Sequence, residues 1–257
     1  MKTLRFSHLN RRRILSLMGG AAAVTLVGCF RESFDAIESP MSSTSANSAS
    51  SVSSSSIAQS VPGCVVRPQQ TAGPFFVDEQ LNRSDIRSNP DDNSIKAGVP
   101  LRLVFQVSQV NGSTCQPLSN AMVDVWHCDA EGVYSDVGEA QGQKFLRGYQ
   151  MTDSSGTAQF VTIYPGWYPG RTPHIHFKIR GSSGDRVGYE FTSQIYFDDA
   201  LSDEVYAQPS YASRGARSVR NERDGIFRSG GDQLILPVTR LGEGYEGRFA
   251  IGLESIN

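Results

Sequence analysis

The sequence predicts an all-β fold, namely an antiparallel β-sandwich with long loops and little helix. Short segments in which apolar and polar residues alternate recur between residues 101 and 254. Turn-forming Gly, Asn and Asp residues separate these segments, and only one stretch has a helical pattern. Short strands joined by such turns are typical of two packed antiparallel sheets.

The expected strands follow from this alternation. Two alternating segments flank the turn sequence NGS, and two more flank the turn sequence DSSG at 153–156, which predicts a hairpin. The predicted strands are residues 101–110, 121–128, 145–152, 157–164, 174–180, 189–197, 232–241 and 247–254. Residues 198–208 are predicted as a helix, with Asp198 or Asp199 as its N-cap.

The composition is that of a soluble globular protein. Of the 257 residues, 19% are charged and 39% are hydrophobic. The formal net charge is −2, and acidic and basic residues are interspersed rather than gathered in blocks. No nucleic-acid partner is therefore expected.

Residues 1–29 are predicted to be an export signal. A basic stretch at Arg11–Arg13 precedes a short apolar run that ends at Cys29 and is too short for a good spanning helix. The basic stretch resembles a twin-arginine signal, and residues 26–29, LVGC, resemble a lipobox. Cleavage before Cys29 and a lipid on its sulfur would anchor an exported protein to a membrane, on the periplasmic side or at the cell surface. The alternative is a plain secretory signal with a chance cysteine.

Residues 30–60 are predicted to be a flexible tether, and residues 61–257 to be the folded domain. Residues 41–60 are rich in Ser and have almost no apolar surface to bury, so they cannot offset the entropy of ordering. The remaining segment is long enough for one sizeable core.

One disulfide is expected among the cysteines that follow Cys29. These are Cys64, Cys115 and Cys128, and an exported protein meets an oxidising compartment. Cys115 and Cys128 lie at opposite ends of a predicted extended segment, too far apart for a bridge. Pairing of Cys64 with Cys128 is preferred.

The stretch 164–179, YPGWYPGRTPHIHFKI, contains half of the four histidines in the chain. In a strand, His174 and His176 share one face while Ile175, Phe177 and Ile179 face the core. The two imidazoles would stand about 7 Å apart at Cα, which suits two ligands of one metal ion. Taken alone, the pattern is a weak signal, because most such pairs are surface or hydrogen-bonded histidines.

The neighbouring residues restrict the kind of metal. Residues 160–178 contain no Asp or Glu for a two-histidine, one-carboxylate ferrous site, although distant carboxylates remain open, and no closely spaced cysteines for structural zinc. Tyrosines are present instead, at Tyr134, Tyr164 and Tyr168. Phenolate is a hard donor that suits Fe³⁺, and two phenolates with one hydroxide balance its charge in a partly buried site.

With these residues the chain resembles the intradiol ring-cleavage dioxygenases, the family of protocatechuate and catechol dioxygenases. The resemblance extends from about Gln69 to Phe197. It rests on the stretches QTAGPFF (70–76), VDVWHCDAEGVYS (123–135), FLRGYQMTDSSG (145–156), YPGWYPGRTPHIHFKI (164–179) and TSQIYF (192–197).

The resemblance implies a ligand set and two further site residues. Tyr134 matches the first tyrosine ligand, Tyr168 the second, and His174 and His176 the two histidines, which excludes Tyr164 as a ligand. Arg171 matches the active-site arginine, and Gln194 matches a glutamine near the substrate. Tyr168 would also act as a base when the substrate binds.

The resemblance further implies an oxidoreductase that contains Fe³⁺ and cleaves a catechol-type aromatic with O₂. Both atoms of O₂ would be inserted into the aromatic, and the ring would be cleaved between the two hydroxylated carbons to give a muconate-type diacid. Only five residues separate Tyr168 from His174, fewer than in many family members, and this shortened active-site loop would open the pocket. The helical dimerisation domain of the catechol-specific branch is lacking, so that mode of dimerisation is not expected.

Three other functions are compatible with parts of the pattern. A tethered β-sandwich could bind an aromatic ligand without catalysis, but such a module would be expected to have lost at least one of the four ligands. An enzyme with another metal, such as copper, is disfavoured by two tyrosines. A structural lipoprotein explains the Ser-rich tether but not the clustered residues.

Overall fold

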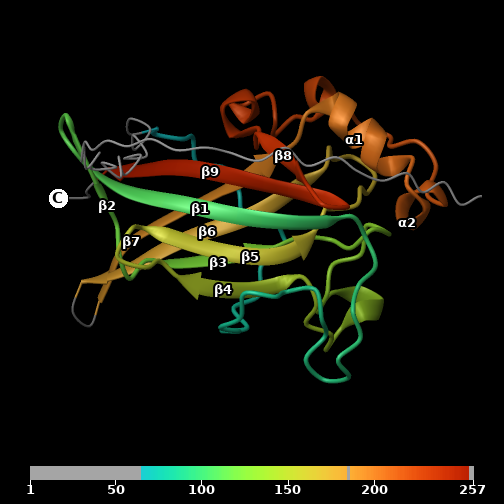
Figure 1. Cartoon of the computed structure of the whole chain (residues 1–257), viewed down its shortest axis with the longest axis horizontal. Coiled ribbons are helices and arrows are strands. Elements are labelled where there is room, and N and C mark those ends of the chain that lie inside the picture. Colours follow the sequence, from blue (N-terminus) through green and yellow to red (C-terminus); the bar gives the residue numbers. More distant parts are fainter. Residues whose placement is uncertain (1–64, 184–185, 255–257) are drawn as a thin grey trace, which may run out of the picture. The chain divides into compact units, whose positions relative to one another are not determined.

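The computed structural model describes residues 65–183 and 186–254, and the predicted signal and tether lie outside the described residues. The described chain forms two β-sheets with two helices (Figure 1). The strands are β1 (Pro100–Asn111), β2 (Thr114–Pro117), β3 (Met122–Trp126), β4 (Arg147–Met151), β5 (Thr157–Ile163), β6 (His174–Ser183), β7 (Arg186–Tyr196), β8 (Val238–Leu241) and β9 (Gly244–Glu254). The helices are α1 (Asp199–Tyr206) and α2 (Pro209–Ala212), with short 3₁₀ turns at Gly138–Ala140, Asn221–Arg223 and Gly231–Leu234.

The two sheets confirm the predicted β-sandwich. One has the order β2-β1-β9-β8, with β5 also paired to β1, and the other has the order β4-β3-β6-β7. Among the strands of the described residues, all pairs are antiparallel except β1 and β9, which run parallel over residues 101–110 and 245–254. The predicted antiparallel sandwich thus has one parallel pair, which the sequence pattern did not indicate. Parallel strands need a long crossover, and here the whole second sheet lies between β1 and β9 in the sequence.

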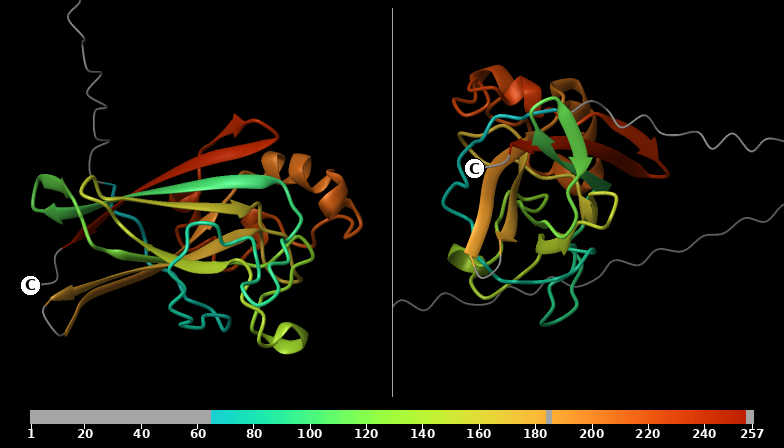
Figure 2. Two further views of the ribbon diagram at one scale, coloured as in Figure 1. Left: turned by 60° about the horizontal axis from the view of Figure 1, so that its bottom comes forward. Right: turned by 90° about the vertical axis from the view of Figure 1, so that its left-hand side faces the viewer.

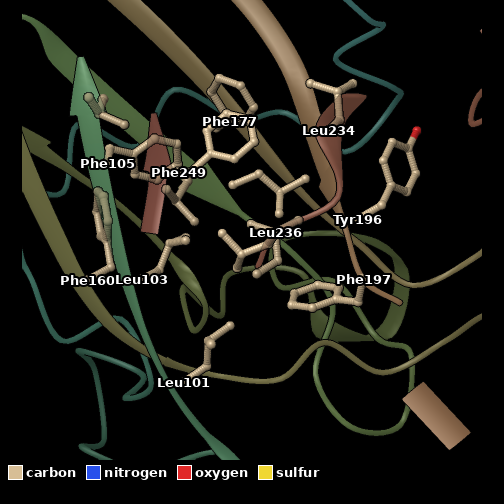
Figure 3. Packing of buried hydrophobic residues seen from close by; sticks show 14 of the residues in the cluster. Leu101, Leu103, Phe105, Phe160, Phe177, Tyr196, Phe197, Leu234, Leu236 and Phe249 are labelled. Carbon is tan, nitrogen blue, oxygen red and sulfur yellow. The ribbon is translucent and has the colours of Figure 1, made fainter. Parts of the chain in front are cut away.

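The inner faces of the sheets pack as the alternation predicts. Leu101, Leu103 and Phe105 of β1 are at most 1% exposed, as are Phe177 of β6 and Phe249 of β9. The rings of Phe105, Phe177 and Phe249 lie 5.3–5.9 Å apart in tilted or edge-to-face contacts (Figure 3). Such contacts add to the free energy gained by burying the rings themselves.

The predicted hairpin of 145–152 and 157–164 is wrong. The turn forms as expected, with the Gly156 amide donating to the Asp153 carbonyl at 2.9 Å. Its two strands, however, belong to different sheets, because β4 pairs with β3 and β5 pairs with β1. The local turn chemistry thus predicts a reversal, whereas long-range pairing decides which sheet each strand joins.

Gly156 shows how tightly this corner is packed. Its φ is +76°, and a Cβ there would lie 2.2 Å from the Val107 carbonyl oxygen. We expect Gly156→Ala to destabilise the protein by about 2–4 kcal/mol, since it combines a left-handed backbone with a backbone clash. Gly112→Ala is the control, because Gly112 has φ +60° but nothing within 4 Å. Urea unfolding should show a clearly smaller loss for Gly112→Ala; equal losses would contradict the packing argument.

The predicted helix is confirmed. Asp198 is the N-cap of α1, and its carboxylate accepts hydrogen bonds from the amides of Ala200 and Leu201. Both helices lie at the end of the sandwich where β1 begins (Figures 1 and 2). There the Tyr211 hydroxyl donates to the Tyr164 carbonyl at 2.7 Å. None of the helices in residues 65–183 and 186–254 has the length and hydropathy of a membrane span.

Two elements differ from the expected strands. Residues 232–241 form a strand only from Val238, because residues 231–234 form a 3₁₀ turn and Pro237 cannot donate to a ladder. The short strand β2 was not predicted; it pairs with the end of β1.

The preferred cysteine pairing is wrong. Cys128 is a free, buried thiol, and Cys115 is disulfide-bonded. Cys128 packs with Trp126 and Tyr134, and burial raises its pKa to about 12. Cys64 lies outside the described residues.

Candidate metal centre

The two histidines lie at the start of β6, as its first and third residues. His174 is the first residue of the strand, and His176 pairs with Trp126 of β3 and Gln194 of β7. As predicted, Ile175 and its alternating neighbours enter the core, and the two imidazoles lie on the opposite face. That face is covered too, because His174 is only 2% exposed and His176 only 1%.

Two neighbours fix the ring of His176. The Trp126 indole stacks on it at 5.0 Å between centroids and 5° between planes. On another side lies the backbone of Gly73, where an added Cβ would be 3.3 Å from His176 Cε1. The QTAGPFF segment therefore passes directly over His176.

The tyrosines come from two loops. Tyr134 follows a turn after β3, in which the Asp129 carboxylate accepts hydrogen bonds from the amides of Glu131 and Val133. It is 4% exposed, and the Phe75 ring stacks on it at 4.4 Å. Tyr168 lies on the loop between β5 and β6 and is half-buried. The more exposed tyrosine is thus the one on the short loop.

The four side chains converge on one point. From Nε2 of His174, the distance is 3.1 Å to Nε2 of His176, 3.2 Å to Oη of Tyr168 and 3.5 Å to Oη of Tyr134. Ligands about 2.1 Å from a common ion lie about 3.0–3.4 Å from one another, so these separations fit a single metal ion. The structure thus brings together all four side chains that the resemblance implies as ligands.

The protonation pattern of the histidines also fits a metal. Nδ1 of His174 lies 2.6 Å from the Thr172 carbonyl, so this nitrogen carries the proton and the lone pair of the ring is on Nε2. Nε2 of His176 points at the same place, and its buried Nδ1 has no hydrogen-bond partner among the described residues. A cation between the two Nε2 atoms could accept a lone pair from each ring. No cluster of three or more His, Cys, Asp or Glu in the described part of the chain could hold a metal, so the tyrosines complete this donor set.

Burial keeps all four side chains neutral without a metal. It lowers the pKa of His174 to about 3, aided by the charge of Arg171, and it lowers the pKa of His176 well below its usual range. Burial also raises the pKa of Tyr134 well above its ordinary value and raises that of Tyr168. If a metal ion bound to both tyrosines as phenolates, two phenolic protons would be released.

Arg171 lies beside the four converging side chains. Its Nε donates to Asp224 at 2.8 Å, its Nη2 donates to Gln194 at 2.6 Å, and its Nη1 lies 3.3 Å from Nε2 of His174. Although burial alone would lower it, the hydrogen bond to Asp224 and the charge of its carboxylate raise the pKa of Arg171. A fixed positive charge thus adjoins the site.

Gln194 lies behind Arg171. It is fully buried; its Nε2 donates to the Thr71 carbonyl at 2.9 Å, and its Oε1 accepts from Arg171 and from the Tyr196 hydroxyl. Both ends of the amide are therefore engaged within the protein. Tyr164, excluded as a ligand by the resemblance, is buried elsewhere, with its hydroxyl 2.7 Å from that of Ser202.

Sequence reasoning missed two polar groups at the site. Asp224 is 53 residues from Arg171 in the sequence, and Asp-Gly at 224–225 indicates only an ordinary turn. Arg147 is 3% exposed and donates to Ser135 Oγ at 2.8 Å and to the Phe75 carbonyl at 2.7 Å. It therefore links the loop that bears Tyr134 to the segment that covers the site.

Comparison with known proteins identifies relatives of this chain. A family model described as "Dioxygenase" matches residues 71–222, more than half of the chain. The chain is 36% identical over 118 residues to the protocatechuate 3,4-dioxygenase beta chain of Burkholderia cepacia, covering 41% of this chain and 49% of that one. The chain spans about half the length, or less, of the first curated relatives it matches.

Two solved structures are similar over most of the folded region. The intradiol ring-cleavage dioxygenase of Tetranychus urticae superposes with a TM-score of 0.65 and 30% identity, over 76% of this chain and 96% of that one. The dioxygenase domain of a dioxygenase carbohydrate-binding protein fusion from Streptomyces sp. SirexAA-E gives a TM-score of 0.53 and 28% identity, over 75% and 100%. By its sequence, its fold and these relatives, the chain belongs to the intradiol ring-cleavage dioxygenase family.

Proposed function

We propose that this protein is an Fe³⁺ intradiol dioxygenase that cleaves a catechol-type aromatic between its two hydroxylated carbons. Both atoms of O₂ enter the product, a muconate-type diacid. The observation that supports this most is the convergence of two phenol oxygens and two imidazole nitrogens beside Arg171. Tyr134, Tyr168, His174 and His176 would hold the iron.

When bound, Fe³⁺ supplies Lewis acidity that draws electron density from a chelated catecholate. The residues of the chain do the rest. Tyr168 is the less buried tyrosine and sits on a loop, so it would be the more readily released of the two tyrosines, and its Oη would accept a proton from a catechol hydroxyl. Nη1 of Arg171 faces the site and stabilises negative charge that develops on the ring.

The aromatic residues around the ligands keep the site rigid and dry. Phe75 stacks on Tyr134, and Trp126 stacks on His176, so neither ligand rotates freely. The low exposure of both histidines limits the access of water. A dry site strengthens the interaction of Arg171 with an anionic substrate.

The test is the reaction of the iron-loaded chain with a panel of catechols. The protein should be red-brown from tyrosinate-to-iron charge transfer, and a catechol added without O₂ should shift the band to longer wavelength. With ¹⁸O₂, mass spectrometry should find both labelled atoms in a ring-opened diacid. A colourless protein with full zinc occupancy would refute the ferric site, and catechol binding without O₂ uptake would indicate an aromatic-binding module. The panel should include protocatechuate, a chlorocatechol and hydroxyquinol, the substrates named in its relatives.

We also propose that the protein is exported and anchored by a lipid on Cys29. The support is the order of the Arg11–Arg13 stretch, the apolar run and the LVGC sequence. Twin-arginine export carries folded proteins, so iron would be inserted before translocation.

Replacing Arg11 and Arg12 by Lys should leave the uncleaved precursor in the cytoplasm, because the export machinery reads the arginine pair. Cys29→Ser should release the protein from membranes, since it removes the sulfur that bears the lipid. Cell fractionation with blotting measures both. Normal maturation of the Arg11/Arg12 variant would contradict the twin-arginine assignment.

A further inference from the structure

The carboxylate of Asp224 is fully buried and fully engaged. Its side chain is 0% exposed. Oδ2 accepts hydrogen bonds from Nε of Arg171 and from the Thr172 amide, each at 2.8 Å. Oδ1 accepts from the amides of Ile226 and Phe227, at 2.7 and 3.0 Å. One carboxylate therefore joins its own turn to the loop that carries Arg171.

These bonds determine which edge of the guanidinium faces the ligands. Asp224 holds Nε and Gln194 holds Nη2, so the remaining nitrogen, Nη1, is the one directed at His174. A planar guanidinium that is hydrogen-bonded at two of its three nitrogens has little freedom to rotate. Without Asp224, the contacts with Gln194 and Tyr196 would hold the guanidinium through a single nitrogen, Nη2.

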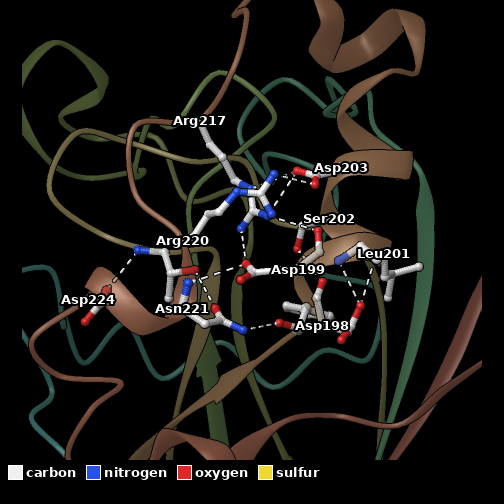
Figure 4. Close-up of polar contacts among 12 residues, drawn as sticks. Asp198, Asp199, Leu201, Ser202, Asp203, Arg217, Arg220, Asn221 and Asp224 are labelled. Atoms are coloured by element: carbon white, nitrogen blue, oxygen red, sulfur yellow. Dashed lines mark hydrogen bonds and ion pairs between the residues drawn. The ribbon is translucent and has the colours of Figure 1, made fainter.

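The segment that carries Asp224 is itself fixed to α1. Arg217 lies between the carboxylates of Asp199 and Asp203 and forms ion pairs with both (Figure 4). Asn221, four residues further on, donates to the Phe197 carbonyl at 2.8 Å and accepts from Thr172 Oγ1 at 2.7 Å. The Thr172 carbonyl in turn accepts the hydrogen bond from Nδ1 of His174. The position of Asp224 is therefore set by the fold and not by Arg171 alone.

We propose that Asp224 is a positioning residue that fixes the guanidinium of Arg171 with Nη1 toward the proposed iron site. This inference rests on the proposed function for its effect on turnover, but its structural part concerns only Asp224 and Arg171. The competing explanation is that Asp224 merely caps its own turn at 224–227.

A double-mutant cycle separates the two explanations. Each carboxylate oxygen of Asp224 accepts two hydrogen bonds. Asp224→Asn replaces one of these oxygens by an NH₂ group, which cannot accept, so two of the four hydrogen bonds are lost. If Asp224 acts by placing Arg171, we expect kcat to fall about 10²-fold while KM, iron content and the visible band change little. In an Arg171→Ala background the same substitution should cause no further loss of kcat. A loss of equal size in both backgrounds would overturn the proposal.

Asp153→Asn is the matched control. Asp153 also caps a turn, accepting from the Ser155 and Thr157 amides at 2.9 Å, but it follows the end of β4 that is remote from Arg147 and the site. It should leave kcat unchanged in both backgrounds.

A second measurement does not depend on catalysis. In the metal-free Arg171→Ala protein, methylguanidinium should occupy the emptied place and raise the unfolding midpoint relative to methylurea, its neutral counterpart at the same concentration. With Asp224→Asn added, this preference for the cation should disappear. Absence of the preference in Arg171→Ala, or its persistence in the double variant, would overturn the proposal. If the Asp224→Asn chain does not fold, the comparison of methylguanidinium with methylurea in Arg171→Ala still tests the proposal. Because this comparison does not measure turnover, it tests the proposal even if the chain proves not to be a dioxygenase.

Discussion

Arg171→Ala should lower kcat by about 10²–10³-fold while iron content and colour stay unchanged. Every proposed ligand remains in place, so the metal should bind as before. The substitution removes a preorganised cation that faces negative charge as the ring is attacked, and loss of one such group raises the barrier by about 3–4 kcal/mol. The Asp224 carboxylate still accepts hydrogen bonds from three backbone amides, so the fold should survive.

Steady-state turnover with saturating catechol, measured beside iron content, tests this expectation. Arg223→Ala is the matched control, since Arg223 is an exposed arginine on the same segment and its loss changes the net charge equally. The control should change kcat very little, as is usual for exposed positions. Near-full turnover in iron-loaded Arg171→Ala would contradict the role assigned to Arg171.

Tyr168→Phe should nearly abolish turnover by a different route. It removes a proposed iron ligand that is also the proposed base for a catechol proton, and a general base contributes about 10²–10⁴-fold in rate. Tyr134, His174 and His176 remain, so most of the iron should stay. One of two phenolates is lost, so the visible band should weaken rather than vanish.

The visible spectrum under nitrogen, before and after a catechol is added, measures this loss separately from turnover. Tyr164→Phe is the control, because it removes the hydroxyl of a nearby tyrosine that is bonded to Ser202 and lies outside the site. It should leave the band unchanged. If Tyr168→Phe kept the full band and Tyr164→Phe lost part of it, the ligand assignment would be wrong.

The sequence predicted those parts of the fold that depend on local pattern. Alternation placed Ile175, Phe177 and Ile179 in the core, and all three are fully buried. The carboxylate of Asp198 caps the helix it was expected to cap. Each of these depends on residues a few positions apart, for which side-chain period and capping chemistry are sufficient.

Contacts between residues far apart in the sequence were harder to predict. The turn at 153–156 forms, but which strands pair with the two strands beside it depends on distant residues. The pairing of Ile163 with Pro100 is an example. The free thiol of Cys128 is explained by its packing with Trp126 and Tyr134, which no cysteine spacing reveals. At the site, the four converging side chains match those implied by the family resemblance, whereas Asp224 carries no local signal of burial.

The parallel pairing of β1 with β9 has a consequence for biosynthesis. Pro100 begins β1 and Gly244 begins β9, so the ribosome adds about 140 residues between them. At about 5–20 residues per second this takes about 7–30 s, during which one edge of β1 has no partner strand. Non-local pairing of this kind also folds slowly. The nascent chain must therefore keep Leu103 and Phe105 from aggregating until its last described strand emerges, and a product truncated before residue 244 should not persist as a partly folded domain.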